Sequence, residues 1–144
     1  MPHSKLDDLP NGGDRWPAIG RDGYKTVQWG DMEVGLTTLS GPLDCSDHYT
    51  HGGLPGGVCP CPHYGYIFHG RLRAVYPGSD WPDEVIEAGE AYFIPSGHVL
   101  IYEEGCRILE LNPAHALHMV MDAMQIASDK ANRARAEAEA KSTG

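Results

Sequence analysis

The feature that most restricts the fold is a succession of short β-prone segments, separated by glycine and proline, between residues 24 and 111. The segments 63–68, 72–76, 91–94 and 99–102 combine aromatic with branched aliphatic residues, which favour strands. The chain contains 18 glycines and 11 prolines, which suit tight turns and interrupt helices. Many short strands at nearly even spacing are typical of an all-β sandwich or barrel.

The two ends of the chain differ from this central region. Residues 1–23 are polar and rich in Gly, Pro and Asp, with Trp16 as an apolar anchor, and predict an arm with little regular structure. At Asn112-Pro113 an N-cap residue precedes a proline suited to the first helical position, which predicts a helix start. Apolar residues then recur at helical spacing, at Leu117, Val120, Met121 and Met124.

These patterns divide the chain into an N-terminal arm (1–23), a β-barrel (24–111) and a C-terminal helix and tail (112–144). Residues 24–29 and 32–40 flank Gly30-Asp31, which predicts a hairpin with a two-residue turn.

Residues 41–57 predict a long loop that carries His48 and His51 between glycine-rich stretches. Long ordered loops are often functional lids, whereas the alternative is a surface excursion with solvated histidines.

A cluster of candidate metal ligands lies at the centre of the chain. Cys59, Cys61 and His63 fall within five residues, and the prolines between them stiffen the backbone. Thiolate and imidazole are the ligands that zinc and related metals prefer. Each residue also has an ordinary alternative, because buried free cysteines and hydrogen-bonded histidines are common.

Composition and charge exclude several classes of function. Eleven basic residues stand against 20 acidic ones, a formal net charge of −9, and no basic cluster predicts nucleic-acid binding. No apolar run approaches the ~20 residues of a membrane helix, and the start lacks a signal-peptide core. We therefore expect a cytoplasmic protein that binds neither membranes nor nucleic acids, whose four cysteines are thiols or ligands and not disulfides.

The pattern Cys-x-x-Pro-His-aromatic-Gly-Tyr, followed by Pro-x-Gly-His, resembles a small single-domain subgroup of the cupin family. Cys59, residues 62–66, residues 70–72 and residues 95–98 carry this resemblance, which spans about residues 24–125. It implies an antiparallel cupin barrel (a double-stranded β-helix, or jelly roll) with a C-terminal α-helix. It also implies a metal in the barrel mouth and, frequently, a dimer.

The resemblance also implies a ligand set. Cupins usually carry two histidines separated by one residue, then a glutamate seven residues before a glycine. Counted back from Gly70, the glutamate position falls on His63, the second histidine position on Cys59 and the first on Gly57, which has no side-chain ligand.

The second motif fits at Gly89, Pro95 and Gly97, but its histidine arrives at His98, two residues before the usual place. A shift of two along a strand keeps a side chain on the same face, so we expect His98 to point inward. The implied metal set is therefore Cys59, His63 and His98.

One thiolate with two imidazoles is typical of an open catalytic zinc site, whereas iron oxygenases usually use two histidines and a carboxylate. Zinc is therefore the expected metal, with iron as the alternative. Cys61 is either a fourth ligand or a turn residue pointing away, and His48 or His51 would be the loop's candidates for a fourth ligand.

The predicted function is a zinc-dependent cupin enzyme that acts on a small organic molecule by lyase, isomerase or hydrolase chemistry without redox change. His51 and Tyr66 are the candidate catalytic residues for proton transfer. The alternatives are a non-haem iron cupin dioxygenase and a non-enzymatic cupin that binds a small ligand. We also expect a homodimer, because one small barrel offers few places to bury the Trp16 arm and the apolar face of helix 113–126.

Overall fold

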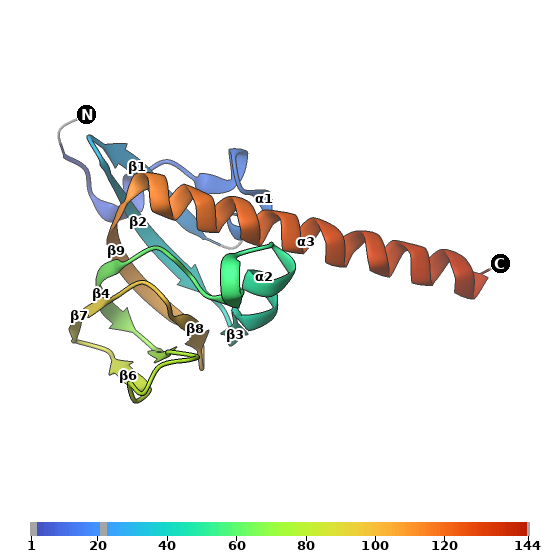
Figure 1. Cartoon of the computed structure of the whole chain (residues 1–144). Helices are drawn as coiled ribbons and strands as arrows, with labels where there is room; N and C mark the ends of the chain where they lie inside the picture. Colours follow the sequence, from blue (N-terminus) through green and yellow to red (C-terminus); the bar gives the residue numbers. More distant parts are fainter. Residues whose placement is uncertain (1–2, 21–22, 144) are drawn as a thin grey trace.

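The computed structural model describes residues 3–20 and 23–143, and its strands form two antiparallel sheets (Figure 1). The five strands of the first sheet are, in order, β1 (Tyr24–Trp29), β2 (Met32–Leu39), β9 (Cys106–Pro113), β4 (His63–His69) and β7 (Ala91–Ile94). The four strands of the second are, in order, β3 (Leu43–Asp44), β8 (Val99–Tyr102), β5 (Arg71–Val75) and β6 (Glu84–Glu87).

Short helices and one long helix surround the sheets. The α-helices are α1 (Pro17–Gly20), α2 (Ser46–His51) and α3 (Ala114–Thr143). The 3₁₀ turns are η1 (Leu6–Asp8), η2 (Gly12–Asp14) and η3 (Pro55–Gly57). None of the helices in the described ranges is long and apolar enough to cross a membrane.

The predicted hairpin is confirmed. Trp29 pairs with Met32 across the turn, and Gly30 adopts a φ of 61°, which a glycine accommodates without strain. Strand β2 then pairs along its whole length with β9, so the hairpin joins the strand that leads into α3.

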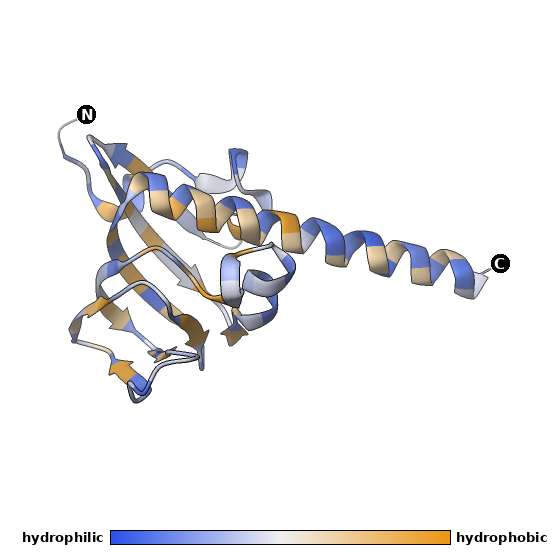
Figure 2. Ribbon diagram, viewed as in Figure 1, coloured by the Kyte–Doolittle hydropathy of each residue, from blue (hydrophilic) through white to orange (hydrophobic). Residues whose placement is uncertain are grey.

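Alternation along β4 separates an inner from an outer face of the first sheet. His63 and Ile67 are buried, whereas Tyr64, Tyr66 and Phe68 are exposed. The buried side chains of both sheets form one core cluster, in which Ile67 and Ile108 of the first sheet join Leu72 and Leu100 of the second. In Figure 2 the apolar colour follows the strands, while much of the outer half of α3 is hydrophilic.

The prediction of one closed barrel is confirmed only in part, because the described strands form two separate sheets. Two local predictions were wrong. The helix start falls at Ala114 and not at Asn112-Pro113, because these residues pair with Glu33 and Met32 as the end of β9. The sequence at 41–57 is not a simple loop, since it forms β3, α2 and η3.

The two surfaces on which we predicted a homodimer are covered within one chain. Trp16 is buried, and its indole N–H donates to Asp122 of α3 at 2.8 Å. Leu117 and Val120 on the apolar face of α3 are also buried within this single chain. These surfaces therefore no longer argue for a dimer.

Candidate metal centre

Three candidate ligands from separate parts of the sequence come together in the core. Cys59, His63 and His98 are buried, and their ligand atoms all lie within 4.8 Å of one another. The Sγ of Cys59 lies 3.6 Å from Nε2 of His63. In a tetrahedral zinc site, Zn–S and Zn–N bonds of about 2.3 and 2.0 Å place neighbouring ligand atoms about 3.5 Å apart. This spacing fits a shared metal ion.

Backbone hydrogen bonds hold two of the ligands side by side. Cys59 and His98 face each other in an isolated antiparallel bridge. The N–H of Cys59 donates to the carbonyl of His98, and the N–H of Gly97 donates to the carbonyl of Cys59, both at 2.8 Å. His63 follows as the first residue of β4, so the third ligand comes from the adjoining strand.

The ring of His98 is oriented for metal binding. Its Nδ1 lies 2.6 Å from the carbonyl oxygen of Pro95, which can only accept a hydrogen bond. The proton of the neutral ring is therefore assigned to Nδ1, which leaves a lone pair on Nε2. This Nε2 is buried and has no hydrogen-bond partner among the described residues. A metal ion would satisfy it, so the residues present fit a metal.

A largely buried carboxylate, that of Glu110, lies behind His63. Oε1 of Glu110 lies 3.3 Å from Nδ1 of His63, close enough for an ion pair but without the alignment of a hydrogen bond. The amide of Asn112 donates to the same oxygen at 3.0 Å, and the hydroxyl of Tyr92 donates to the other. A carboxylate behind a ligating histidine fixes the ring and raises its basicity, as in carboxylate–histidine–zinc triads.

Gly65 allows this arrangement. It lies between Tyr92 and Glu110 on neighbouring strands, paired with each in register. A Cβ at Gly65 would lie 2.4 Å from the ring of Tyr92 and 2.7 Å from the carbonyl oxygen of Leu109. The missing side chain therefore lets the tyrosine cross β4 and reach the carboxylate.

The proximity of these groups shifts their pKa values. Burial alone would raise the pKa of Cys59, but the adjacent imidazoles of His63 and His98 lower it to about 7. Burial opposes the charged form of His63, yet the Glu110 carboxylate raises its pKa to about 10. Burial likewise disfavours ionised Glu110, but His63 and the donors around it lower its pKa to about 2. Without a metal, the buried thiol of Cys59 therefore lies beside an ion pair between His63 and Glu110.

A cavity of about 360 Å³ adjoins the ligand group. It lies against β2, β9, α2 and α3, and three of its polar wall residues are His63, Glu110 and Asn112. Cys59 and His98 do not line it. A molecule in this cavity would therefore meet the centre at His63.

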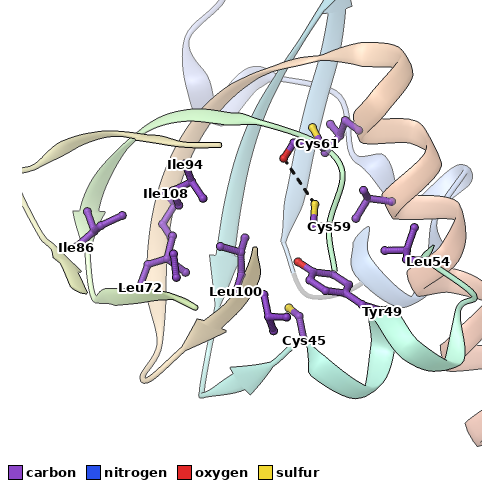
Figure 3. Packing of buried hydrophobic residues seen from close by; sticks show 14 of the residues in the cluster. Cys45, Tyr49, Leu54, Cys59, Cys61, Leu72, Ile86, Ile94, Leu100 and Ile108 are labelled. Carbon is purple, nitrogen blue, oxygen red and sulfur yellow. Dashed lines mark hydrogen bonds between the residues drawn. The ribbon is translucent and has the colours of Figure 1, made fainter. Parts of the chain in front are cut away.

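The remaining candidates from the sequence lie elsewhere. Cys61 is buried, and its Sγ donates to the carbonyl of Pro62 at 3.2 Å, outside the ligand group. Its carbonyl accepts from Cys59, as the dashed line in Figure 3 shows. His48 lines the cavity, whereas His51, three residues on, is exposed and does not line it. The four cysteines are free thiols, as predicted.

Tyr66 is on the outer face of β4, because positions 63 and 66 of one strand point to opposite sides. It does not line the cavity beside the ligand group. Neither His51 nor Tyr66 is therefore placed for catalysis at this centre.

Sequence reasoning missed Glu110, Asn112 and Tyr92. A signal for Glu110 was present, since it shares a strand face with the buried Ile108. A carboxylate on an otherwise apolar face indicates a buried partner. The expected helix start at Asn112 hid the continuation of this strand.

Known proteins with similar structures share little sequence identity with this chain. No protein-family model matches the chain, and no curated protein matches it. A solved cupin-2 domain protein from Shewanella frigidimarina shares 18% identity, with a TM-score of 0.42, over 72% of this chain and 92% of its own. The polyketide cyclase RemF from Streptomyces resistomycificus shares 17% identity, with a TM-score of 0.48, over 78% of this chain and 79% of its own. The EutQ protein of Clostridium difficile shares 14% identity, with a TM-score of 0.42, over 62% of this chain and 65% of its own.

The chain is cupin-like. Its sequence motifs, its two antiparallel sheets and the Cys/His ligand group carry this statement. At these identities and TM-scores the comparison transfers no activity, ligand or partner to this cupin-like chain.

Proposed function

We propose that the protein is a zinc-dependent cupin enzyme that acts on a small organic molecule without redox change, as a lyase, isomerase or hydrolase. The observation that carries this proposal is the convergence of Cys59, His63 and His98 beside a cavity. Three protein ligands leave a position for water or substrate in a tetrahedral site. The group in the described part of the chain contains no fourth ligand.

Bound zinc would supply a Lewis acid for a carbonyl oxygen, or would activate a water molecule. The chain's own residues have separate tasks. Glu110 orients the ring of His63 through the contact at Nδ1. Apolar side chains of α3 form part of the cavity wall and would displace water from a bound molecule, which would strengthen electrostatic interactions there.

His48 is the proposed proton carrier, in place of His51. Its Nδ1 is buried without a hydrogen-bond partner among the described residues, and its side chain belongs to the cavity wall. An imidazole can accept a proton at one ring nitrogen and donate one from the other, and is therefore suited to general acid–base catalysis.

Zinc is proposed over iron because of where the carboxylate lies. Glu110 contacts Nδ1 of His63, whereas Cys59 lies by Nε2, so the carboxylate stands behind the ligand ring. A two-histidine-one-carboxylate iron site needs the carboxylate on the metal.

We also propose that the two sheets are the walls of a jelly-roll barrel. We propose in addition that the protein is cytoplasmic.

A second candidate function is a cupin that binds a small ligand and uses its metal only to connect strands. The burial of Cys59 and His98, neither of which lines the cavity, favours this candidate. Cobalt-substituted protein separates the two functions. If the metal has an open position, added azide changes the cobalt absorption spectrum, whereas a closed structural site leaves the spectrum unchanged.

Metal analysis tests the foundation of both candidates. Protein purified without added metal should contain about one zinc per chain, and Cys59→Ser or His98→Ala should remove it. Cys61→Ser is the matched control, because Cys61 is equally buried, is two residues away and lies outside the group. Substoichiometric metal that is unaffected by the two ligand substitutions would refute the proposal.

A further inference from the structure

The proposed function leaves the wall of the cavity unassigned. The cavity volume of about 360 Å³ lies within the range of small-molecule sites, about 300–1,000 Å³. Its apolar lining includes one face of α3 and the end of β2, with Leu39, Leu117, Val120, Met121 and Met124. The polar end is formed by His63, Glu110 and Asn112.

The charges around this cavity are few. None of the described residues that line it is a lysine or an arginine, and Glu110 is the single carboxylate among them. Arg15 of the arm turns toward His118 and Asp122, at 3.3 and 3.8 Å, and does not line the cavity. An anion inside would therefore lose its hydration without a lysine or an arginine to pair with, and the imidazole of His63 already lies against the carboxylate of Glu110.

The metal would add little net attraction for an anion. A zinc ion would be bound by Cys59 as a thiolate, and Glu110, which lies 3.3 Å from His63, is the one carboxylate among the described lining residues. Both groups would offset the charge of the ion. A site of neutral imidazoles alone would keep both positive charges.

We infer that the ligand is an uncharged, largely apolar organic molecule with a carbonyl or hydroxyl oxygen directed toward His63, and that the site rejects carboxylates and phosphates. The part of this inference that directs the ligand's oxygen toward His63 rests on the proposed function. The preference for a neutral molecule rests on the cavity wall, with or without the metal.

Acetophenone and benzoate are suitable probes, since they have similar size and shape but differ in charge at neutral pH. Their dissociation constants are measured by calorimetry on the metal-free and the zinc-loaded protein. We expect acetophenone to bind more tightly than benzoate by about tenfold or more in both forms, because the described wall offers the anion neither a lysine nor an arginine and places the carboxylate of Glu110 beside it. Equal or tighter binding of benzoate to the zinc-loaded protein would overturn the inference.

A cation placed in the wall should reverse the preference. Met121→Lys introduces an ammonium group on the cavity side of α3, and Met119→Lys is the matched control on the exposed side of the same helix. We expect M121K to favour benzoate over acetophenone and M119K to behave as wild type. Circular dichroism checks that both variants are folded, and the wild-type comparison stands by itself if M121K does not fold.

The outcomes separate this inference from the proposed function. If the protein binds no zinc but the metal-free form still prefers acetophenone, the function is wrong and the inference stands. If zinc binds at Cys59, His63 and His98 while benzoate binds as tightly as acetophenone, the inference is wrong and the metal centre stands. Failure of acetophenone to bind either form at millimolar concentration also counts against the inference.

Discussion

Replacing Glu110 by glutamine tests whether the buried carboxylate tunes the metal centre. The substitution keeps the shape of the side chain but removes its charge. In the native centre the two oxygens of Glu110 face three donors, on His63, Asn112 and Tyr92. A glutamine offers one oxygen and an NH₂ group, so at least one buried donor loses its acceptor. The ring of His63 also loses the negative charge that favours its role as a ligand.

The expected cost follows from comparable partners of ligating histidines. Removing such a partner typically weakens metal binding by about 10- to 100-fold, which corresponds to about 1.4–2.7 kcal/mol. Competition with a chromophoric chelator at fixed pH measures the zinc affinity of E110Q and wild type. Glu87→Gln is the control, because Glu87 forms an exposed ion pair with Arg71 at 2.8 Å, belongs to β6 of the second sheet and lies outside the ligand group.

We expect E87Q to bind zinc as the wild type does. If E110Q is folded, as judged by its melting curve, and also binds zinc with wild-type affinity, the argument that Glu110 orients His63 is refuted.

Four further predictions follow from the same geometry. Gly65→Ala should destabilise the fold by about 1–3 kcal/mol, because the new Cβ would lie 2.4 Å from the ring of Tyr92. Urea unfolding measures this change, and unchanged stability would contradict the close packing of the Tyr92 ring over Gly65. Zinc binding at pH 7 should release more than one proton, because metal-free His63 is protonated with a pKa of about 10 and Cys59, with a pKa of about 7, is about half ionised. Calorimetry in two buffers of different ionisation enthalpy measures the number of protons released. Zinc affinity should also rise with pH, because both groups lose their protons. Acetophenone should shift the imidazole NMR signals of His48 and leave those of His51 unchanged, and the reverse pattern would remove His48 as proton carrier. We also expect a homodimer through the exposed aromatic side chains of β4 and β7, which are Tyr64, Tyr66, Phe68 and Phe93. Phe93→Asp should convert the dimer to a monomer in light scattering, and a monomeric wild type at micromolar concentration would refute this expectation.

The strands and the ligand cluster could be predicted from the sequence because both are local patterns. Alternation of side chains with a period of two, between glycine-containing turns, indicates a strand whichever strand it pairs with. Cys59 and His63 lie only four residues apart. His98 required a second step, the resemblance to a known motif. The bridge from Cys59 to His98 shows why the distant histidine belongs with the cluster.

Tertiary pairing decided the places where sequence reasoning failed. Asn112 and Pro113 carry a strong local signal for a helix start, but β9 keeps both as strand because it pairs with β2. Tyr66 was excluded by a rule available from the sequence, since it is three positions from His63 and so on the opposite face of the strand. The cavity could not be predicted, because it depends on where α3 lies against the sheet.

Because Cys59 and His98 form a bridge, a metal bound to both would also stabilise the fold. The chain between them contains β4, β5, β6 and β7, which belong to both sheets. A metal bound at both ends closes this stretch into a ring and lowers the entropy of its unfolded form. Loss of a bound metal should therefore loosen this one contiguous stretch while the pairing of β1, β2 and β9 persists. Limited proteolysis of the metal-free protein would then cut within residues 59–98 first, and metal binding would lengthen the lifetime of the protein.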